Sequence, residues 1–172
     1  MPVSTKFTLE QARALEEKLK EELIRRAIEQ KVITSREEAV IRDIIPDVDL
    51  GATRNVWEQT LATADAYNDV YSVTLPDKKV IGFYGFKTKA STPVVTAVKF
   101  ALGTGGAKVK DIWQVETAHT ELNAEARAIV PIIYNKSETV TISMYNSGSA
   151  GATDNVILLG FVVEPKGELV TQ

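Results

Sequence analysis

The spacing of apolar residues changes once along this chain, near residue 55, and this change constrains the fold more than any other feature. Over residues 8–30 the apolar residues recur at three- and four-residue steps, as on one face of an amphipathic helix. After residue 55, short segments alternate between apolar and polar residues and are separated by turn residues, which is typical of β-strands. We therefore expect an N-terminal helical arm with its linker at 1–50 and a β-domain at 51–172.

Residues 8–30 are predicted to form the longest helix. Thr8 can cap its first turn, and Gln11 lies three positions later, where its side chain can complete a capping box. Part of the apolar stripe is a candidate interface, with its residues at Leu15, Leu19, Leu23, Ile24, Ala27 and Ile28. Because an exposed stripe of this kind favours aggregation, some surface must cover it. That surface could belong to the same chain or to a neighbouring subunit.

A second, shorter helix is predicted over residues 34–45. Thr34 and Ser35 precede Glu37 and Glu38 in the order of a capping box, and Pro46 would end the helix.

Eight strands are predicted in the second part of the chain, at 56–62, 70–75, 80–86, 94–102, 109–116, 128–134, 140–145 and 155–163. Most have no helix between them, so a parallel sheet with crossover helices is excluded. Eight strands favour a jelly roll over a seven-stranded immunoglobulin sandwich. The expected fold is thus mainly β, an eight-stranded antiparallel jelly-roll sandwich with an N-terminal α-helical arm.

Composition argues against several classes of function. The 20 Lys and Arg residues do not exceed the 23 Asp and Glu residues, so direct nucleic-acid binding is not expected. The chain has no Cys and a single His, which leaves little for thiol chemistry, catalytic triads or zinc sites. His119 lies near Glu116 and Glu121, but one imidazole with loop carboxylates is a weak metal site. We expect no enzyme activity, no catalytic residues, no cofactor and no metal.

Two local patterns have simple structural explanations. The glycine-rich segment 103–108 lies between predicted strands and not before a helix, so it is predicted to be a hairpin turn and not a phosphate-binding loop. The longest apolar run, 156–163, is far shorter than the roughly 20 residues needed to cross a bilayer, so no membrane association is expected.

Two classes of function remain open. One is a structural protein that assembles with copies of itself. The other is a non-catalytic carbohydrate- or ligand-binding β-sandwich module. The aromatic residues that could form a sugar-binding platform, although core packing also explains most of them, are Trp57, Tyr67, Tyr71, Phe83, Tyr84, Phe86 and Trp113.

The C-terminal half favours the first class. It carries the alternating run Thr-Val-Thr-Ile-Ser-Met-Tyr at 139–145, a Gly/Ser-rich loop, and a long apolar run that ends at Glu164 and Pro165. Over residues 67–168 this arrangement resembles jelly-roll capsid and capsid-decoration proteins of bacteriophages. The resemblance implies a virion structural protein, made in the host cytoplasm, that forms homo-oligomers, with trimers favoured. It also implies contacts with a major capsid protein lattice, in which the helical arm ties neighbouring subunits together.

Overall fold

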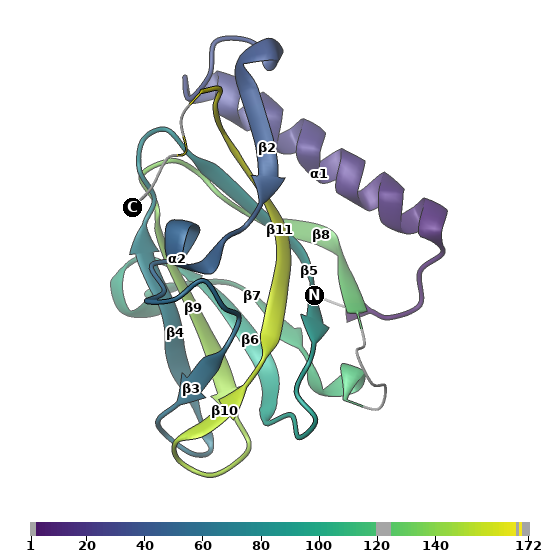
Figure 1. The fold of residues 1–172 in the computed structure, drawn as a ribbon, viewed down its shortest axis with the longest axis vertical. Helices are drawn as coiled ribbons and strands as arrows, with labels where there is room; N and C mark the ends of the chain where they lie inside the picture. Colours follow the sequence, from purple (N-terminus) through teal and green to yellow (C-terminus); the bar gives the residue numbers. More distant parts are fainter. Residues whose placement is uncertain (1–2, 120–124, 168, 170–172) are drawn as a thin grey trace.

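β-Strands are the main secondary structure of the chain, and they are arranged in antiparallel sheets (Figure 1). The computed structural model describes residues 3–119, 125–167 and 169. In sheet order, the five-stranded sheet contains β1 (Val3–Ser4), β8 (Glu125–Tyr134), β5 (Val80–Thr88), β11 (Val156–Pro165) and β2 (Ala39–Asp43). The four-stranded sheet contains β4 (Ala66–Thr74), β9 (Thr139–Asn146), β6 (Val95–Leu102) and β7 (Lys108–Gln114), and a small third sheet pairs β10 (Ala152–Asp154) with β3 (Gln59–Leu61). The expectation of a mainly β, antiparallel fold is confirmed.

The strand pairs are nested along the sequence. The innermost pair is β6 with β7, and it is enclosed in turn by β5 with β8, β4 with β9, β3 with β10, and β2 with β11. The chain therefore runs out and back as one long antiparallel ribbon, whose pairs are distributed between the sheets. Between the two larger sheets lies the main core, which contains Phe83, Phe100 and Trp113.

Strands β5 and β11 of the five-stranded sheet are buried on both faces. Phe83 points into the main core, whereas the next residue, Tyr84, joins a second apolar cluster on the opposite face. In β11, likewise, Val162 belongs to the main core and Val163 belongs to the second cluster. This explains the continuous apolar runs in β5 and β11, because a strand covered on both sides does not need to alternate apolar and polar residues.

Each of the eight predicted strands overlaps an observed one, with shifted ends. The first, predicted at 56–62, is reduced to β3, and the sixth, predicted at 128–134, begins earlier, at Glu125. The structure adds β1, β2 and β10, which the sequence did not predict. Segment 103–108 forms the β6–β7 hairpin turn, as predicted, with a short 3-10 turn η2 (Thr104–Gly106). Between β7 and β8 lies the 3-10 turn η3 (Glu116–Ala118), and the rest of the connection, 120–124, falls outside the described residues.

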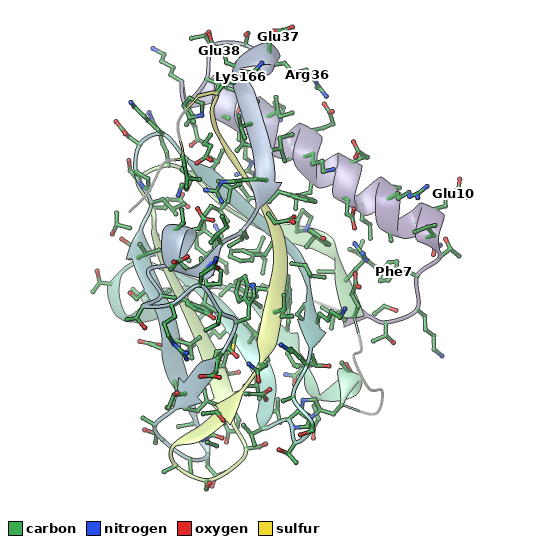
Figure 2. All side chains as sticks on the ribbon, in the orientation of Figure 1. Phe7, Glu10, Arg36, Glu37, Glu38 and Lys166 are labelled. Carbon is green, nitrogen blue, oxygen red and sulfur yellow. The ribbon has the colours of Figure 1, made fainter. Side chains whose placement is uncertain are left out.

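The helix predicted over 34–45 is wrong. Only the 3-10 turn η1 (Arg36–Glu38) forms there, and the chain continues as the edge strand β2, with Ile41 opposite Val163 of β11. Val40 and Ile41 are β-branched and suit a strand better than a helix. Figure 2 shows Arg36, Glu37, Glu38 and Lys166 together at the end where β2 and β11 meet. Helix α2 (Pro46–Asp49) then begins at the proline expected to end the earlier helix.

A buried ion network fastens the β2–α2 segment to the sheet. Asp49 accepts hydrogen bonds from Lys79 (2.7 Å), from both terminal nitrogens of Arg42 (2.7 and 2.8 Å) and from the Ile45 amide (2.7 Å). Arg42 also donates to Glu164 of β11, at 2.7 Å from its Nε. Lys79 and Asp49 are fully buried. Residues 39–49, which lie before the expected boundary at residue 50, are thus joined to the five-stranded sheet. The division into an arm at 1–50 and a β-domain at 51–172 stays a prediction.

Helix α1 (Leu9–Glu29) covers the outer face of the five-stranded sheet, over β5, β8 and β11 (Figure 1). It begins as predicted: the Thr8 side chain accepts from the Gln11 amide, and the Gln11 side chain accepts from the Thr8 amide. The molecule therefore has three layers, a helix, a five-stranded sheet and a four-stranded sheet.

Candidate assembly surface

The apolar stripe of α1 packs on its own chain. Leu19, Leu23, Ile24 and Ala27 are buried in the second apolar cluster, together with Tyr84 and other residues of the five-stranded sheet. Leu15 is half-buried at the margin, and Ile28 remains 39% exposed. The sequence left open whether this stripe is covered by the same chain or by a neighbouring subunit. In the structure the sheet of the same chain covers it, so the centre of the stripe is not available to a neighbouring subunit.

Polar contacts add to the attachment of α1. Glu16 forms an ion pair with Arg127 of β8. At the other end of the helix, the Gln30 side chain donates to Asn135 at 2.7 Å and accepts from the Lys136 amide at 3.0 Å. The i,i+4 pair between Glu22 and Arg26 forms as the sequence spacing indicates, at 2.8 Å. The helix is therefore fixed to the rest of the chain from Glu16 to Gln30.

A bulge in β8 exposes apolar side chains beside the helix. In the pairing of β5 with β8, Phe83 lies opposite Ile132 and Gly85 lies opposite Arg127. Four residues of β8, 128–131, therefore lie opposite a single residue of β5, Tyr84. Ile129 is 57% exposed and Val130 is 48% exposed. Pro131 follows and has no N–H to donate to a neighbouring strand. We call residues 129–131 the β8 bulge. Such bulges turn a strand and redirect its side chains, and together with proline they prevent simple edge-to-edge pairing.

A groove runs between α1 and the β8 bulge. Its central part has a volume of about 810 Å³ and is lined by Lys18, Glu21, Glu22, Arg25, Arg26, Ile129, Val130, Pro131 and Ile133. Two smaller hollows continue it, since they share residues with the central part. One, of about 290 Å³, extends toward Phe7 and Leu15, and the other, of about 500 Å³, extends toward Lys110 and Asp111 of β7. Together they form a surface with an apolar floor and charged walls, here called the α1–β8 groove.

The charges along the helical wall are partly neutralised within the chain. Hydrogen bonds from Arg25 and then Arg26 lower the pKa of Glu22 to about 2. Glu21 pairs with Arg36 instead of with Arg25, and its pKa is also lowered by that contact. Lys18 is exposed and forms no ion pair with any described residue.

The sequence missed the β8 bulge as a candidate surface. The available signal was the run Ile129-Val130-Pro131 inside a predicted strand, where consecutive apolar residues cannot all share one face and proline indicates an edge or a bulge. The alternating pattern instead predicts an ordinary strand of the sandwich at 128–134.

The other sequence candidates lie apart from this surface. Tyr67 is 37% exposed on β4 and packs edge-on against Tyr145, with a ring-centroid distance of 5.3 Å, whereas the other six candidate aromatics are buried or packed partly into the cores. His119 is half-buried after η3. Among residues 3–119, 125–167 and 169, no group of three or more His, Asp or Glu side chains is placed to hold a metal ion.

Comparisons of this chain with family models, with curated proteins and with solved structures gave no match. In the part of the chain that the structure describes, no helix has both the length and the apolar character required to cross a membrane.

Proposed function

We propose that this chain is a structural subunit that assembles with copies of itself, and more specifically a virion protein that decorates or builds a bacteriophage capsid. The observation that carries the assembly role is the exposure of Ile129 and Val130 on the β8 bulge, next to the α1–β8 groove. Exposed apolar patches that are rimmed by polar residues, as here by the charged wall of α1, are typical of interaction sites.

The virion role is supported by the antiparallel arrangement of the strands in two larger sheets, which we infer to be a jelly roll. A jelly roll is an eight-stranded double-sheet arrangement of antiparallel strands. Here two four-stranded halves can be recognised, β2-β11-β5-β8 and β4-β9-β6-β7, built from nested pairs. The first of these eight strands is β2, whereas the first predicted strand corresponds to β3. Apart from that exchange, the arrangement agrees with the resemblance of residues 67–168 to phage capsid and decoration proteins. In this proposal the jelly roll packs beside other subunits, and α1 contributes its outer surface to the contact.

The assembly role is tested by sedimentation velocity of the purified chain over a wide range of concentrations, alone and with candidate capsid shells. We expect the chain to form oligomers and to co-sediment with shells. Ile129→Asp with Val130→Asp should shift the chain toward the monomer, because carboxylates would have to be desolvated in the contact. Val56→Asp is the matched control, since Val56 is also an exposed valine, at 43%, but lies away from the groove.

Two results would contradict the proposal. One is a wild-type chain that remains monomeric at every concentration and does not co-sediment with shells. The other is tight binding of an oligosaccharide by such a monomer, which would favour the ligand-binding alternative. Circular dichroism of each variant confirms that the β-fold is retained.

A further inference from the structure

Strand β2 covers only part of β11, and this leaves a short stretch of the sheet edge open. Asp43, the last residue of β2, lies opposite Phe161, whereas β11 begins at Val156. Figure 1 shows β2 ending part-way along β11, from where the chain turns toward α2. At the far end, the Gln59 side chain covers Val156: it accepts from the Val156 amide at 2.9 Å and donates to the Val156 carbonyl at 3.0 Å. The open edge is therefore limited to residues 157–160, here called the β11 slot.

Backbone groups of two buried residues point out of this edge. In an antiparallel strand, the N–H and C=O groups of every second residue point to the same side. In β11 the even-numbered residues point toward β2, as shown by Val156 and by Lys166, whose amide donates to the Glu38 carbonyl at 2.7 Å. Both backbone groups of Leu158 and the N–H of Gly160 have no hydrogen-bond partner on this side among residues 3–119, 125–167 and 169. Since buried residues rarely leave such groups unpaired, the slot is suited to bind the backbone of another chain.

The slot is hollowed and has an aromatic wall. Two hollows, of about 250 Å³ and about 260 Å³, lie along it and share Trp57 and Ile157. Trp57 is half-buried and packs edge-on against Tyr71, with a ring-centroid distance of 5.8 Å. Its carbonyl accepts from Asn155 Nδ2 at 2.8 Å. The wall is therefore fixed in place by contacts within the chain.

Charges of opposite sign lie at the two ends of the slot. Ile157 lines both hollows, one together with Asp43 and the other together with Lys89. Asp43 and Lys89 are exposed, and neither forms an ion pair with any residue that the structure describes. Glu58 also lines the second hollow, but it is paired with Arg54 at 2.7 Å. The slot is thus negative where β2 ends and positive at the opposite end.

We propose that the β11 slot binds a short extended segment of a partner protein, which adds to the sheet antiparallel to β11 and in line with β2. In such strand addition, backbone hydrogen bonds provide affinity and alternate side chains provide specificity. The central residue of the segment exchanges two backbone hydrogen bonds with Leu158, and its side chain faces Trp57 and Ile44, which belong to the main-core side. The residues before and after it project to the other face, toward Asp43 and Lys89 respectively. Charge complementarity therefore specifies a basic–apolar–acidic segment.

Two other strand edges are protected against such pairing. The outer strand β7 carries the exposed residues Lys108 and Lys110, and β8 has its bulge with Pro131. Lysines on an edge strand, bulges and proline all oppose the addition of a further strand. Residues 157–160, by contrast, are all uncharged and include no proline. The contact goes beyond the assembly role and does not depend on it, because the slot shares no lining residue with the α1–β8 groove.

The test uses a synthetic peptide, Thr-Lys-Val-Glu-Thr, blocked at both ends and titrated into the isotope-labelled full chain by NMR. We expect the amide signals of Leu158 and Gly160 and the indole signal of Trp57 to shift saturably, with a Kd at or below about 1 mM. The same peptide N-methylated at its valine lacks the donor to the Leu158 carbonyl and should not bind measurably.

Exchanging the end charges tests the orientation. Asp43→Lys and Lys89→Glu should each weaken binding of this peptide about threefold or more, because an attractive contact becomes a repulsive one. The chain with both changes should prefer the reversed peptide, Thr-Glu-Val-Lys-Thr. Asp77→Lys and Lys78→Glu are the matched controls, since these residues are an exposed pair of opposite charge in the β4–β5 turn. They should leave the preference unchanged.

Several outcomes would overturn the proposal. They are the absence of these shifts, equal binding of the N-methylated peptide, or a preference that does not follow the exchanged charges. Maltohexaose is titrated as well, because binding of this sugar at Trp57 in place of the peptide would make the slot a carbohydrate site. A shift of the same amides with protein concentration alone would show that a second copy of the chain occupies the slot.

Discussion

Leu19 of α1 packs directly onto Gly82 of β5: a Cβ atom added at residue 82 would lie 2.7 Å from Leu19 Cδ1. Leu23 Cδ2 would lie 3.2 Å from the same point. The absence of a side chain at residue 82 thus lets two leucines of the helix rest on the backbone of the sheet. This contact sets how closely the helix and the five-stranded sheet approach each other.

Gly82→Ala is expected to destabilise the protein by about 1–3 kcal/mol, because the new methyl group overfills the contact with Leu19. Denaturant unfolding measures the change. Leu19→Ala alone leaves a cavity and should cost about 2–5 kcal/mol. The double variant should be less destabilised than the two single variants predict together, since the added methyl then occupies part of the cavity. Strict additivity would contradict the contact.

Lys79→Met is expected to cost about 3–5 kcal/mol of folding free energy, because it leaves the buried carboxylate of Asp49 without one of its two cationic partners. Lys78→Met is the control, since Lys78 is exposed and its loss should change stability by less than about 0.5 kcal/mol. Combining Lys79→Met with Asp49→Leu leaves Arg42 paired with Glu164 and should recover part of the loss.

The same network makes stability depend on pH. Burial alone would raise the pKa of Asp49, but hydrogen bonds from Arg42, the Ile45 amide and Lys79 outweigh it and hold the pKa below its ordinary value. A lowered pKa in the folded state contributes stability above the unfolded value of about 3.9, and this contribution is lost as pH falls through the folded value. The stability difference between wild type and Asp49→Asn should therefore be full at pH 7 and shrink below about pH 4. A constant difference from pH 7 to pH 3 would show that the carboxylate charge is not involved.

Thr8→Ala is expected to destabilise the protein by about 1 kcal/mol, since it removes the side-chain acceptor of the Gln11 amide at the start of α1. Thermal unfolding followed by circular dichroism measures this. Thr117→Ala, at a threonine of η3 that caps no long helix, gives the comparison, and an equal effect of the two changes would argue against a specific role of the cap.

A chain that begins at Gly51 is expected not to unfold cooperatively, because it lacks β2 and the partners of Lys79 and Glu164. The periodicity alone predicts the opposite, an independent β-domain at 51–172. A sharp thermal transition of this shortened chain with a β-type spectrum would show that the sheet tolerates an open edge and the loss of Arg42 and Asp49.

Features of the fold that depend on neighbouring residues could be predicted from the sequence, whereas features that depend on distant residues could not. The capping box at Thr8 and the helix after it depend on neighbouring residues, so they could be predicted. The mainly β character of the second part follows from alternation along each strand. Strand β2 could not be predicted in this way, because Val40 and Ile41 take their conformation from pairing with β11, more than 100 residues later. Likewise, the candidate surface depends on a bulge opposite Tyr84, which exists only once β5 and β8 are paired.

The nested strand pairs also determine when the protein can fold. The β6–β7 hairpin is complete once residue 114 has been made, but β2 must wait for residues 156–165, at the far end of the chain. Closing so long a loop is entropically costly, and folds rich in such distant contacts form slowly. During synthesis on the ribosome, the segment with Arg42 and Asp49 therefore remains without its strand partner until residues 156–165 have emerged. Completion of the five-stranded sheet therefore waits for the synthesis of β11, which follows all of its other strands.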